Sequence, residues 1–532
     1  MRKYTLRFLD KVGGSRLEMR KKILPGGKMG LKTEVLIVGG GATGVGIARD
    51  LSRRGIPLIL IEKGDFAFGA SGRNHGLLHS GARYAVTDPQ AAKECMEENR
   101  ILRKIAPHCI EETGGLFISL PEDGLDFRDR FLRACEKVGI PTHLISPEEA
   151  LHLEPGLNPD LLSAVQVPDG AIDPFALILS NAREAEAYGA TFLLHTEVLS
   201  ILSEKGKVKG VRVKDQLTGE EYSIETSFLI NATGAWADHF LKPLGLRIGM
   251  ALSKGSMMIT NRRLSQRVIN RCRPPSDGDI VVPNHTVSIL GTTSVRVTEV
   301  ENFEITPSEI SLLIHETSRM IPSIEGCRFI RAYAGIRPLF MEEGKEEDRS
   351  ISRGFVLIDH EKRDGLKNLI TITGGKLITY RLMAEKASDL ICEKMGISIP
   401  CSTHLIPLPG ADQPRGLKER LKNLPRGETL CDCELVKRDE VEELLKDKEL
   451  KELQDLLHRT RMAKGTCQGG FCVYRLLGVL NESEKEFGDS NRILKGFLEE
   501  RWKGIQPILW GSAVKEEEVV EGIYKVIFNL KS

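Results

Sequence analysis

Long hydrophobic runs, aromatic residues and an excess of charge are all scarce in this chain of 532 residues. No run approaches the roughly 18 consecutive apolar residues of a transmembrane helix, so no membrane span is expected. Aromatic residues make up 5%, and the net charge of +1 gives no reason to expect binding to nucleic acid. The remaining composition, 41% hydrophobic and 28% charged, is typical of a globular protein. The length predicts about three or four domains.

The basic N-terminal segment, residues 1–30, lacks the apolar stretch of about 7–15 residues that a secretory signal requires. Residues 1–28 carry nine basic and two acidic side chains. We expect this leader to be disordered. The alternative is a misassigned start, with translation beginning at Met29, because Gly26-Gly27-Lys28 could be encoded by a ribosome-binding sequence.

Disulfide bonds are also expected to be absent. Eleven cysteines is an odd number, and a large chain without a secretory signal is expected in a reducing, cytoplasmic compartment. Seven cysteines are scattered and need no special role. The other four cluster near the C-terminus.

A dinucleotide-binding pattern begins at residue 33. An apolar strand over 33–38 enters a glycine-rich turn, and a helix then runs to about Arg54. A second apolar strand, over 57–61, ends at Glu62. The order of strand, turn, helix, strand and acid is much more specific than the glycines alone.

Each key position of this pattern has a physical role. Gly39 permits the tight turn, Gly41 lets backbone amides approach a pyrophosphate, and Gly44 allows close contact between helix and strand. Glu62 is placed to accept a hydrogen bond from a ribose hydroxyl, and its charge disfavours a 2′-phosphate. The pattern predicts dinucleotide binding without separating FAD from NAD.

Two later segments favour FAD. Residues 228–234 and 369–380 each predict an apolar strand that ends in a turn of small residues, and an elongated FAD needs contacts from strands far apart in the chain. With these motifs the sequence resembles the FAD-dependent glycerol-3-phosphate dehydrogenase family, related to D-amino-acid oxidase, and within it the FAD-carrying A chains of the anaerobic branch. The matching segments lie between about residues 33 and 400 and are 70–84, 167–174, 254–256, 291–293, 334–339 and 374–381.

The resemblance implies oxidation of sn-glycerol 3-phosphate to dihydroxyacetone phosphate, with hydride transfer from C2 to FAD. Arg337, and after it Arg83, are candidates for binding the phosphate, since a guanidinium group can donate two parallel hydrogen bonds. Structural ion pairs are the alternative for both. His79 is the candidate acceptor for the C2 hydroxyl proton, and a core histidine is the alternative. Aerobic relatives carry a histidine where this chain has Met257, so no base is expected there.

The same resemblance implies the residues that hold FAD. One group lies in the loop over the pyrophosphate and isoalloxazine, and the other surrounds the ribityl chain and flavin ring. The first group is Ser71, Arg73, Asn74 and Leu77, and the second is Gly234, Gly375, Lys376, Leu377 and Thr379.

A proline-rich linker is expected over 401–428, followed by a cysteine-bearing domain over 429–482 and a helical tail over 483–532. Four clustered thiols in a reducing compartment predict metal ligands. Their spacing fits zinc poorly and resembles the 2Fe-2S domain of bacterioferritin-associated ferredoxin; zinc or purely structural thiols remain the alternatives. The expected ligands are Cys431, Cys433, Cys467 and Cys472.

The expected fold class is α/β. We predict a Rossmann-like FAD domain and an α+β substrate domain with a mostly antiparallel sheet, together within 31–400, and a small helical iron-sulfur domain.

The resemblance implies B and C partner subunits, a quinone as electron acceptor, and peripheral attachment to the cytoplasmic membrane face through those partners. The alternatives are an amino-acid or 2-hydroxy-acid dehydrogenase of the same superfamily, and a non-catalytic FAD and iron-sulfur electron-transfer subunit.

Overall fold

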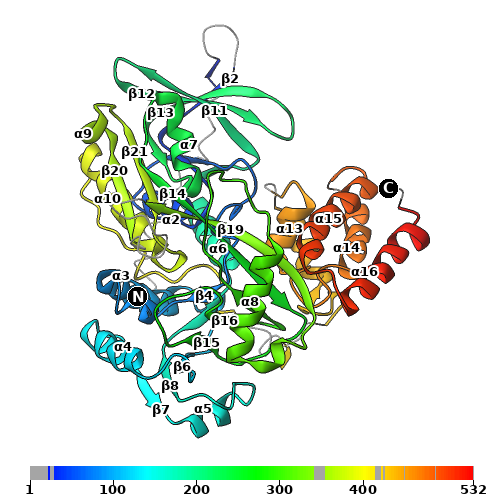
Figure 1. Ribbon diagram of the computed structural model, residues 1–532. Coiled ribbons are helices and arrows are strands. Elements are labelled where there is room, and N and C mark those ends of the chain that lie inside the picture. Colours follow the sequence, from blue (N-terminus) through cyan, green and yellow to red (C-terminus); the bar gives the residue numbers. More distant parts are fainter. Residues whose placement is uncertain are drawn as a thin grey trace.

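The computed structural model describes residues 22–23, 29–340, 354–413, 421–422, 426–447, 450–483, 485 and 487–530. In these residues two large mixed sheets lie next to each other, and a helical C-terminal module sits on one flank (Figure 1). The described helices include none that is long and apolar enough to cross a membrane. The predicted α/β class is confirmed.

The first sheet has a parallel centre. Its strands are apolar and buried on both faces, as expected for a parallel sheet covered by helices. Ile37 pairs with Leu60 on one side and with Ile230 on the other, and Ile230 pairs with Ile370. The central strands in order are β10 (Thr191–Leu193), β3 (Leu58–Ile61), β2 (Met29–Val38), β13 (Glu221–Asn231) and β21 (Leu369–Gly374). The two segments predicted as late strands are therefore β13 and β21, and both belong to the sheet of the first strand: β13 pairs with β2, and β21 pairs with β13.

Antiparallel strands extend this sheet, and helices cover it. The extensions are β11 (Thr196–Glu204), β12 (Lys207–Asp215) and β20 (Phe355–Asp359). One face packs against α2 (Ala42–Arg53), α6 (Pro174–Ala187) and α10 (Tyr380–Met395), which share one apolar core with it. The short helix α7 (Ala237–Leu241) packs with apolar residues of β2 and β3, and α9 (His360–Asp364) lies next to β20 and β21.

The N-terminal boundary differs from the prediction. Strand β2 begins at Met29, four residues before the expected Thr33, and its start pairs with the short strand β1 (Lys22–Ile23). The reason is that β13 is longer than its apolar run, and its Ser223 pairs with Gly30. The leader predicted over 1–30 thus overlaps the sheet at its end. Its residues 1–21 and 24–28 lie outside the described part.

The second sheet is mostly antiparallel, as predicted. Within the described strands, its parallel pair joins two of the nine, β15 and β6. The order is β18 (Val295–Arg296), β14 (Met250–Thr260), β17 (Val287–Gly291), β16 (Ile280–Asn284), β15 (Val268–Arg271), β6 (Gly115–Ser119), β8 (Ser163–Val167) and β7 (His143–Ile145), with β19 (Phe329–Phe340) paired to β14. Helix α8 (Pro307–Met320) packs on this sheet. Further helices are α3 (Pro89–Ile105), α4 (Asp126–Lys137) and α5 (Pro147–Leu153), and a small sheet joins β4 (Leu77–Leu78), β9 (Gly170–Ile172) and β5 (Ile110–Glu111).

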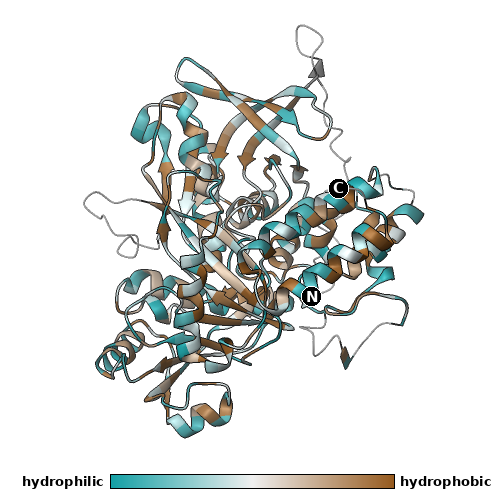
Figure 2. Cartoon of the chain, turned by 45° about the vertical axis from the view of Figure 1, so that its right-hand side comes forward, coloured by the Kyte–Doolittle hydropathy of each residue, from teal (hydrophilic) through white to brown (hydrophobic). Residues whose placement is uncertain are grey.

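The C-terminal module has one apolar core that unites the cysteine-bearing segment with the tail. Leu456 and Leu476 of the first part pack with Phe497 and Tyr524 of the second. Figure 2 shows these helices as two-faced, with apolar residues along one side and polar residues along the other. The helices are α12 (Arg438–Leu445), α13 (Leu453–Thr460), α14 (Cys472–Glu482), α15 (Ser490–Ile505) and α16 (Ser512–Gly522), beside the strand pair β22 (Thr429–Cys431) and β23 (Val436–Lys437). The predicted tail is helical, but it completes the core of the cysteine module.

Ion pairs attach this module to the rest of the chain. Arg461 lies between Asp173, which caps α6, and Glu434 of its own module. Three histidine–carboxylate pairs also cross the boundary, and they join His195 to Asp455, His285 to Glu434 and His458 to Asp65. These contacts are not predictable from the sequence, because their members are separated by about 150 to 400 positions.

Raising the pH should weaken one of these contacts. Burial alone would lower the pKa of His195, but Asp455, 3.2 Å from Nε2, outweighs it and raises the pKa above the usual value. The His195 cation therefore stabilises the docked module below its unfolded pKa, and this contribution is lost as the pH rises through the folded pKa. We expect wild type to melt at a higher temperature than His195→Gln at pH 6, and the gap to narrow by pH 9. An equal difference in melting temperature at both pH values would contradict a charged pair.

The expected linker is partly built into the first domain. Arg49, fully buried in α2, donates to the carbonyl oxygens of Thr403 and Ile406. Leu408 lies in the apolar core beside it. Residues 401–413 are therefore packed against the protein, and the later prolines of the predicted linker, Pro414 and Pro425, lie outside the described residues.

Candidate functional site: a dinucleotide cavity and a cysteine centre

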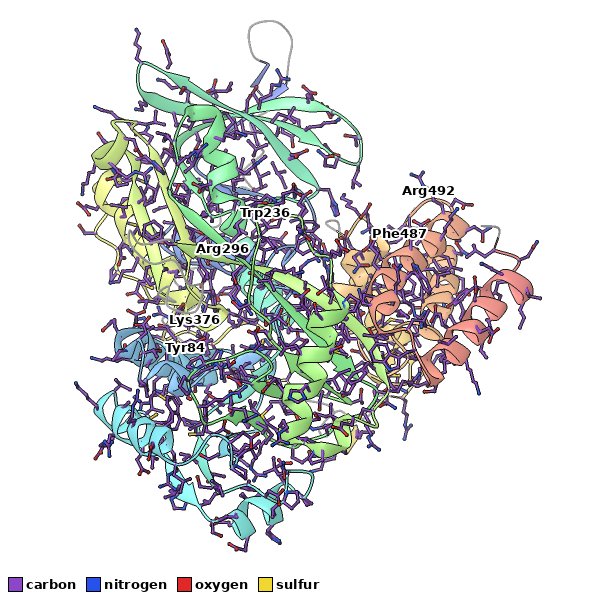
Figure 3. All side chains as sticks on the ribbon, viewed as in Figure 1. Tyr84, Trp236, Arg296, Lys376, Phe487 and Arg492 are labelled. Carbon is purple, nitrogen blue, oxygen red and sulfur yellow. The ribbon has the colours of Figure 1, made fainter. Side chains whose placement is uncertain are left out.

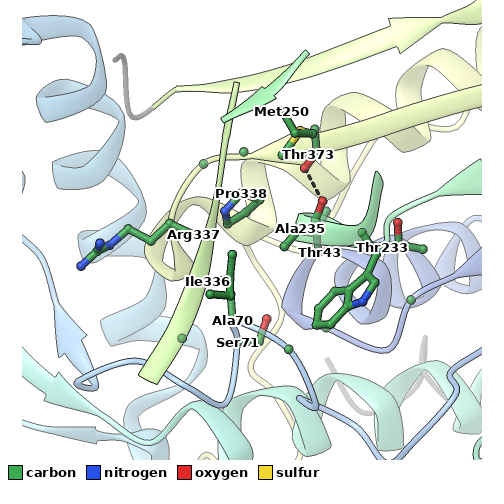
Figure 4. Close-up of a pocket in the computed structure, with 18 of the residues that line it drawn as sticks. Thr43, Ala70, Ser71, Thr233, Ala235, Met250, Ile336, Arg337, Pro338 and Thr373 are labelled. Carbon is green, nitrogen blue, oxygen red and sulfur yellow. Dashed lines mark hydrogen bonds between the residues drawn. The ribbon is translucent and has the colours of Figure 1, made fainter. Parts of the chain in front are cut away.

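A cavity of about 1670 Å³ opens between the two sheets. Its walls come from the carboxyl ends of β2, β3, β13 and β21 on one side and from β14 and β19 on the other. This is where parallel α/β sheets bind ligands, because the turns after the strands meet there. Figure 4 shows Thr43, Ser71, Thr233 and Ile336 around it, with Arg337 extending away from them toward the opposite end.

The glycine turn has the shape that a pyrophosphate requires. Gly39 has a φ of +116°, and a Cβ on Gly44 would lie 1.9 Å from the Gly39 carbonyl oxygen. Gly41 is the N-cap of α2 and supplies no side chain, so the N-terminus of the helix faces the cavity. A helix N-terminus of this kind binds anions. This geometry is compatible with the predicted roles of the turn glycines. Gly44 lies outside the cavity lining and acts through its close packing against Gly39.

Glu62 follows β3 and lines the same cavity. Its carboxylate accepts hydrogen bonds from the N–H groups of Gly40, at 2.7 Å, and Gly64, at 3.1 Å. Burial raises its pKa, although these N–H groups oppose the shift. The two bonds fix the carboxylate beside the glycine turn, where a ribose would lie.

The loop of residues 70–77 closes the cavity from the other side. Ser71 Oγ accepts from the N–H of Ala42 at 3.0 Å, which ties the loop to the start of α2. Arg73 packs over the ring of Phe303, 4.1 Å from its centre. Asn74 bonds to the loop backbone and holds its shape, and Leu77 begins β4. All four predicted residues line the cavity.

The far wall brings in the residues after β13 and β21. Gly234, Gly375, Lys376 and Leu377 line the cavity, and the Lys376 ammonium lies 4.5 Å from the centre of the Tyr84 ring (Figure 3). Thr379 does not line it. Its hydroxyl accepts from the N–H of Lys376 at 3.1 Å, so it stabilises the turn that places the lysine.

Arg337 is placed by two facing glycines. Gly255 of β14 pairs with Gly335 of β19, and a Cβ on Gly255 would lie 2.3 Å from Arg337 Nη2. The guanidinium can therefore lie flat across β14. It donates from Nη1 to Ser253 Oγ at 3.3 Å, and from Nη2 to Thr292 Oγ1 at 2.5 Å and to the Thr293 carbonyl at 2.9 Å. These contacts orient a cation in the cavity wall.

Arg83 has the structural ion pair that was one of its two predicted alternatives, and it keeps a further donor at the cavity. Its Nη2 pairs with Asp279 at 2.8 Å and donates to the Ser276 carbonyl, so the guanidinium has a structural ion pair. Its Nη1 is buried and has no hydrogen-bond partner among the described residues. Arg83 lines the cavity, and so does Met257, at the position where no base was expected.

Two histidines lie at this cationic end. Burial, followed by the charges of His75, Lys376 and Arg83, lowers the pKa of His79 well below its usual value. His75 was not predicted, although it lies in the matching segment 70–84; its ring is 6.0 Å from that of His79. The sequence cannot show that the charges of Arg337 and Arg83 act on a loop histidine, so its position next to Asn74 was the one available signal.

The four clustered cysteines converge in the C-terminal module. Hydrogen bonds from the Cys433 and Cys472 thiols, and from the N–H groups of Phe471 and Gly469, lower the pKa of Cys467 to about 2. Cys431 in turn contacts Cys472. Gly469 has a φ of +84°, and Gly465 packs against Cys433, where a Cβ would lie 2.3 Å from the cysteine Cβ. The donor set of four thiols with amides aimed at sulfur fits a metal centre.

Comparison with known proteins identifies the family. The family model described as FAD dependent oxidoreductase matches residues 34–390, which is more than half of the chain. This chain belongs to the FAD-dependent oxidoreductase family. The expected fold and cofactor, FAD, are thereby confirmed, and the cavity residues above are those available to hold it.

Relatives of this FAD-dependent oxidoreductase extend over nearly its whole length. The FAD-family chain named as the A component of anaerobic glycerol-3-phosphate dehydrogenase in Escherichia coli K12 is 45% identical over 527 residues, which cover 94% of this chain and 97% of the relative. The chain of the same name from Haemophilus influenzae is 44% identical, covering 94% of each chain. The A1 component of the Haloferax volcanii dehydrogenase is 40% identical, covering 93% of this chain and 90% of the relative. The resemblance seen in the motifs is confirmed.

Solved structures share the fold of this oxidoreductase. Glycerol-3-phosphate dehydrogenase from Bacillus halodurans, complexed with FAD, has a TM-score of 0.62 at 22% identity and covers 90% of this chain and 96% of that one. Glycine oxidase from Geobacillus kaustophilus has a TM-score of 0.57 at 22% identity, covering 71% and 98%. Fold similarity at this identity does not distinguish a phosphate substrate from an amino acid.

Gly335 offers a test of the FAD cavity. A Cβ there would lie 2.2 Å from the Arg73 carbonyl oxygen, so Gly335→Ala must displace the 70–77 loop. We expect a loss of about 1–3 kcal/mol in stability and release of FAD, measured by thermal melting and bound-flavin absorbance. Gly326→Ala is the matched control, because no atom lies within 4 Å of its added methyl group. Full flavin content in the Gly335 variant would show that the loop does not hold the cofactor.

Proposed function

We propose that this chain oxidises sn-glycerol 3-phosphate to dihydroxyacetone phosphate. The observation that carries the proposal is the cationic end of the FAD cavity, where Arg337 and Arg83 lie in the same cavity as the glycine turn. The full-length relatives, named as components of glycerol-3-phosphate dehydrogenases, support the same substrate. FAD, when bound, supplies the two-electron acceptor for the C2 hydride.

Arg337 is the proposed phosphate ligand. Its contacts with Ser253, Thr292 and Thr293 hold it at a fixed angle in the wall, where its positive charge faces the cavity. Lys254, on the same strand as Ser253, is turned into a buried pair with Glu309 at 2.9 Å and does not line the cavity. The phosphate therefore meets Arg337 and the Nη1 side of Arg83.

His79 is the proposed acceptor for the C2 hydroxyl proton. It is neutral in the protein, because burial and the surrounding cations lower its pKa. A phosphate dianion beside Arg83 offsets part of that positive field and raises the basicity of the imidazole. Substrate binding thus prepares His79 to take the proton as the hydride leaves C2.

The proposed electron route continues through the cysteine centre. A 2Fe-2S cluster held by Cys431, Cys433, Cys467 and Cys472 would supply a one-electron carrier. Electrons then pass to B and C partner subunits and on to a quinone. The names of the relatives, which mark each as one component of a larger enzyme, support such an assembly. Peripheral attachment of a cytoplasmic chain to the membrane through those partners completes the proposal.

Anaerobic reduction of the flavin tests this function. Glycerol 3-phosphate should bleach the flavin absorbance of the purified holoprotein, whereas proline, glycine and 2-hydroxyglutarate should not. Bleaching by one of those three instead would favour an amino-acid or 2-hydroxy-acid dehydrogenase. If none of the four compounds bleaches the flavin, the chain is an electron-transfer component without its own substrate.

A further inference from the structure

His75 is held rigidly at the cationic end of the cavity. On its N-terminal side, the Asn74 carbonyl accepts from the Tyr333 hydroxyl at 2.9 Å, and the Asn74 side chain accepts from the N–H of Gly76 at 2.8 Å. On its C-terminal side, Gly76 has a φ of +69° and packs against the Ile172 carbonyl. Because the backbone is fixed on both sides, the imidazole has a defined place in the cavity wall.

The imidazole of His75 has an unused polar atom. Its Nδ1 is buried and has no hydrogen-bond partner among the described residues. Buried polar atoms in folded proteins almost always have a partner, so an orphan of this kind in a cavity wall points to a ligand. Burial and then the charges of Arg337 and Arg83 lower the pKa of His75 to about 3, which leaves the ring neutral and able to carry one proton on Nδ1.

A second unused donor lies in the same segment. Arg83 Nη1 is also buried, with no partner in the described part of the chain, while Nη2 is occupied by Asp279 and Ser276. The charges of Arg83 and Arg337 both act on the His75 ring, and all three side chains line the same cavity. A phosphoryl group offers three terminal oxygens and can serve all three side chains, whereas a carboxylate has only two oxygens.

We propose that His75 is a substrate-binding residue that donates from Nδ1 to a phosphoryl oxygen, and that it makes the site select phosphorylated over carboxylated substrates. This inference rests on the proposed function for its substrate. It assigns His75 to binding and leaves the proton transfer to His79. The ring therefore stabilises the bound substrate and the transition state equally, so its loss should raise KM and leave kcat nearly unchanged.

The test compares His75→Ala with His75→Asn in the holoprotein, with exposed His143→Ala as the matched control. The Asn amide can place a donor close to the position of Nδ1. For His75→Ala we expect KM for glycerol 3-phosphate and the inhibition constant of inorganic phosphate to rise together, about 10- to 100-fold, with kcat within about threefold. His75→Asn should recover most of this loss, and inhibition by glycerate, a carboxylate, should not change.

Two results would overturn the inference. Unchanged phosphate inhibition in His75→Ala, with full FAD content, would show that the ring does not touch the anion. A fall in kcat at unchanged KM would place His75 on the reacting oxygen instead. Phosphate binding can be measured from the change that it causes in the flavin spectrum, and this measurement does not require turnover. It therefore tests His75 even if glycerol 3-phosphate fails to reduce the flavin, which would be a failure of the proposed function itself.

Discussion

Arg337→Lys is expected to lower kcat/KM for glycerol 3-phosphate about 10- to 100-fold while FAD stays bound. The guanidinium is oriented by Ser253, Thr292 and Thr293 and lies across Gly255, so its position depends on a flat group with several donors. An ammonium group keeps the charge but offers a single point of contact. Hydrogen bonds to charged groups contribute about 1.5–3 kcal/mol, which corresponds to the expected loss.

Steady-state kinetics with a dye acceptor would measure this loss, and bound-flavin absorbance would show that the cavity is intact. Arg212→Lys is a suitable control, since Arg212 is exposed on β12 and lies outside the cavity lining. A change of about twofold or less in kcat/KM for the Arg337 variant would mean that this residue does not bind the phosphate.

Cys467→Ser is expected to remove the iron and its visible spectrum completely. Two neighbouring thiols and two backbone N–H groups act on Cys467 and lower the pKa of its thiol, which favours the thiolate form that a metal requires. A neutral hydroxyl is a poor replacement for a thiolate ligand. Transfer of electrons to the partner subunits or to quinone should then fall sharply, while glycerol 3-phosphate still bleaches the flavin in its separate cavity.

Iron analysis, visible absorbance and quinone-linked turnover would be measured on the same preparation. Cys327→Ser is the control, because Cys327 is partly exposed, lies far from the quartet in sequence, and donates to a carbonyl as serine also can. Full quinone-linked turnover without iron would show that the centre is structural. Zinc in place of iron in the wild type would refute the 2Fe-2S assignment.

The parts of the site that the sequence predicts well are those encoded by local patterns. The turn from Gly39 to Gly44 is recognisable because steric demands on glycine are local, and Arg337 because an arginine in an apolar run needs a ligand or a partner. Thr379 was predicted to lie around the flavin, but it does not line the cavity and instead bonds to the backbone of Lys376. A motif does not show which of its side chains face the cavity.

What the sequence could not predict depends on contacts between distant segments. Neither the position of His75 near the charges of Arg337 and Arg83 nor the pairing of Arg461 with Asp173 leaves a periodic or compositional trace. The prolines after residue 400 predicted a linker, and they do not show that this segment packs against the first domain. The buried guanidinium of Arg49 donates hydrogen bonds to two carbonyl oxygens of the segment.

The pairing of β13 with both β2 and β21 has a consequence for biosynthesis. The cavity needs residues near 38 and 62 and also residues 372–383, so no ribosome-bound chain can enclose FAD until about 380 residues have emerged. The chain must first bring together strands more than 300 positions apart, which carries an entropic cost. FAD therefore cannot be enclosed before β21 has emerged, and every residue of the cavity lining is synthesised before the cysteine module.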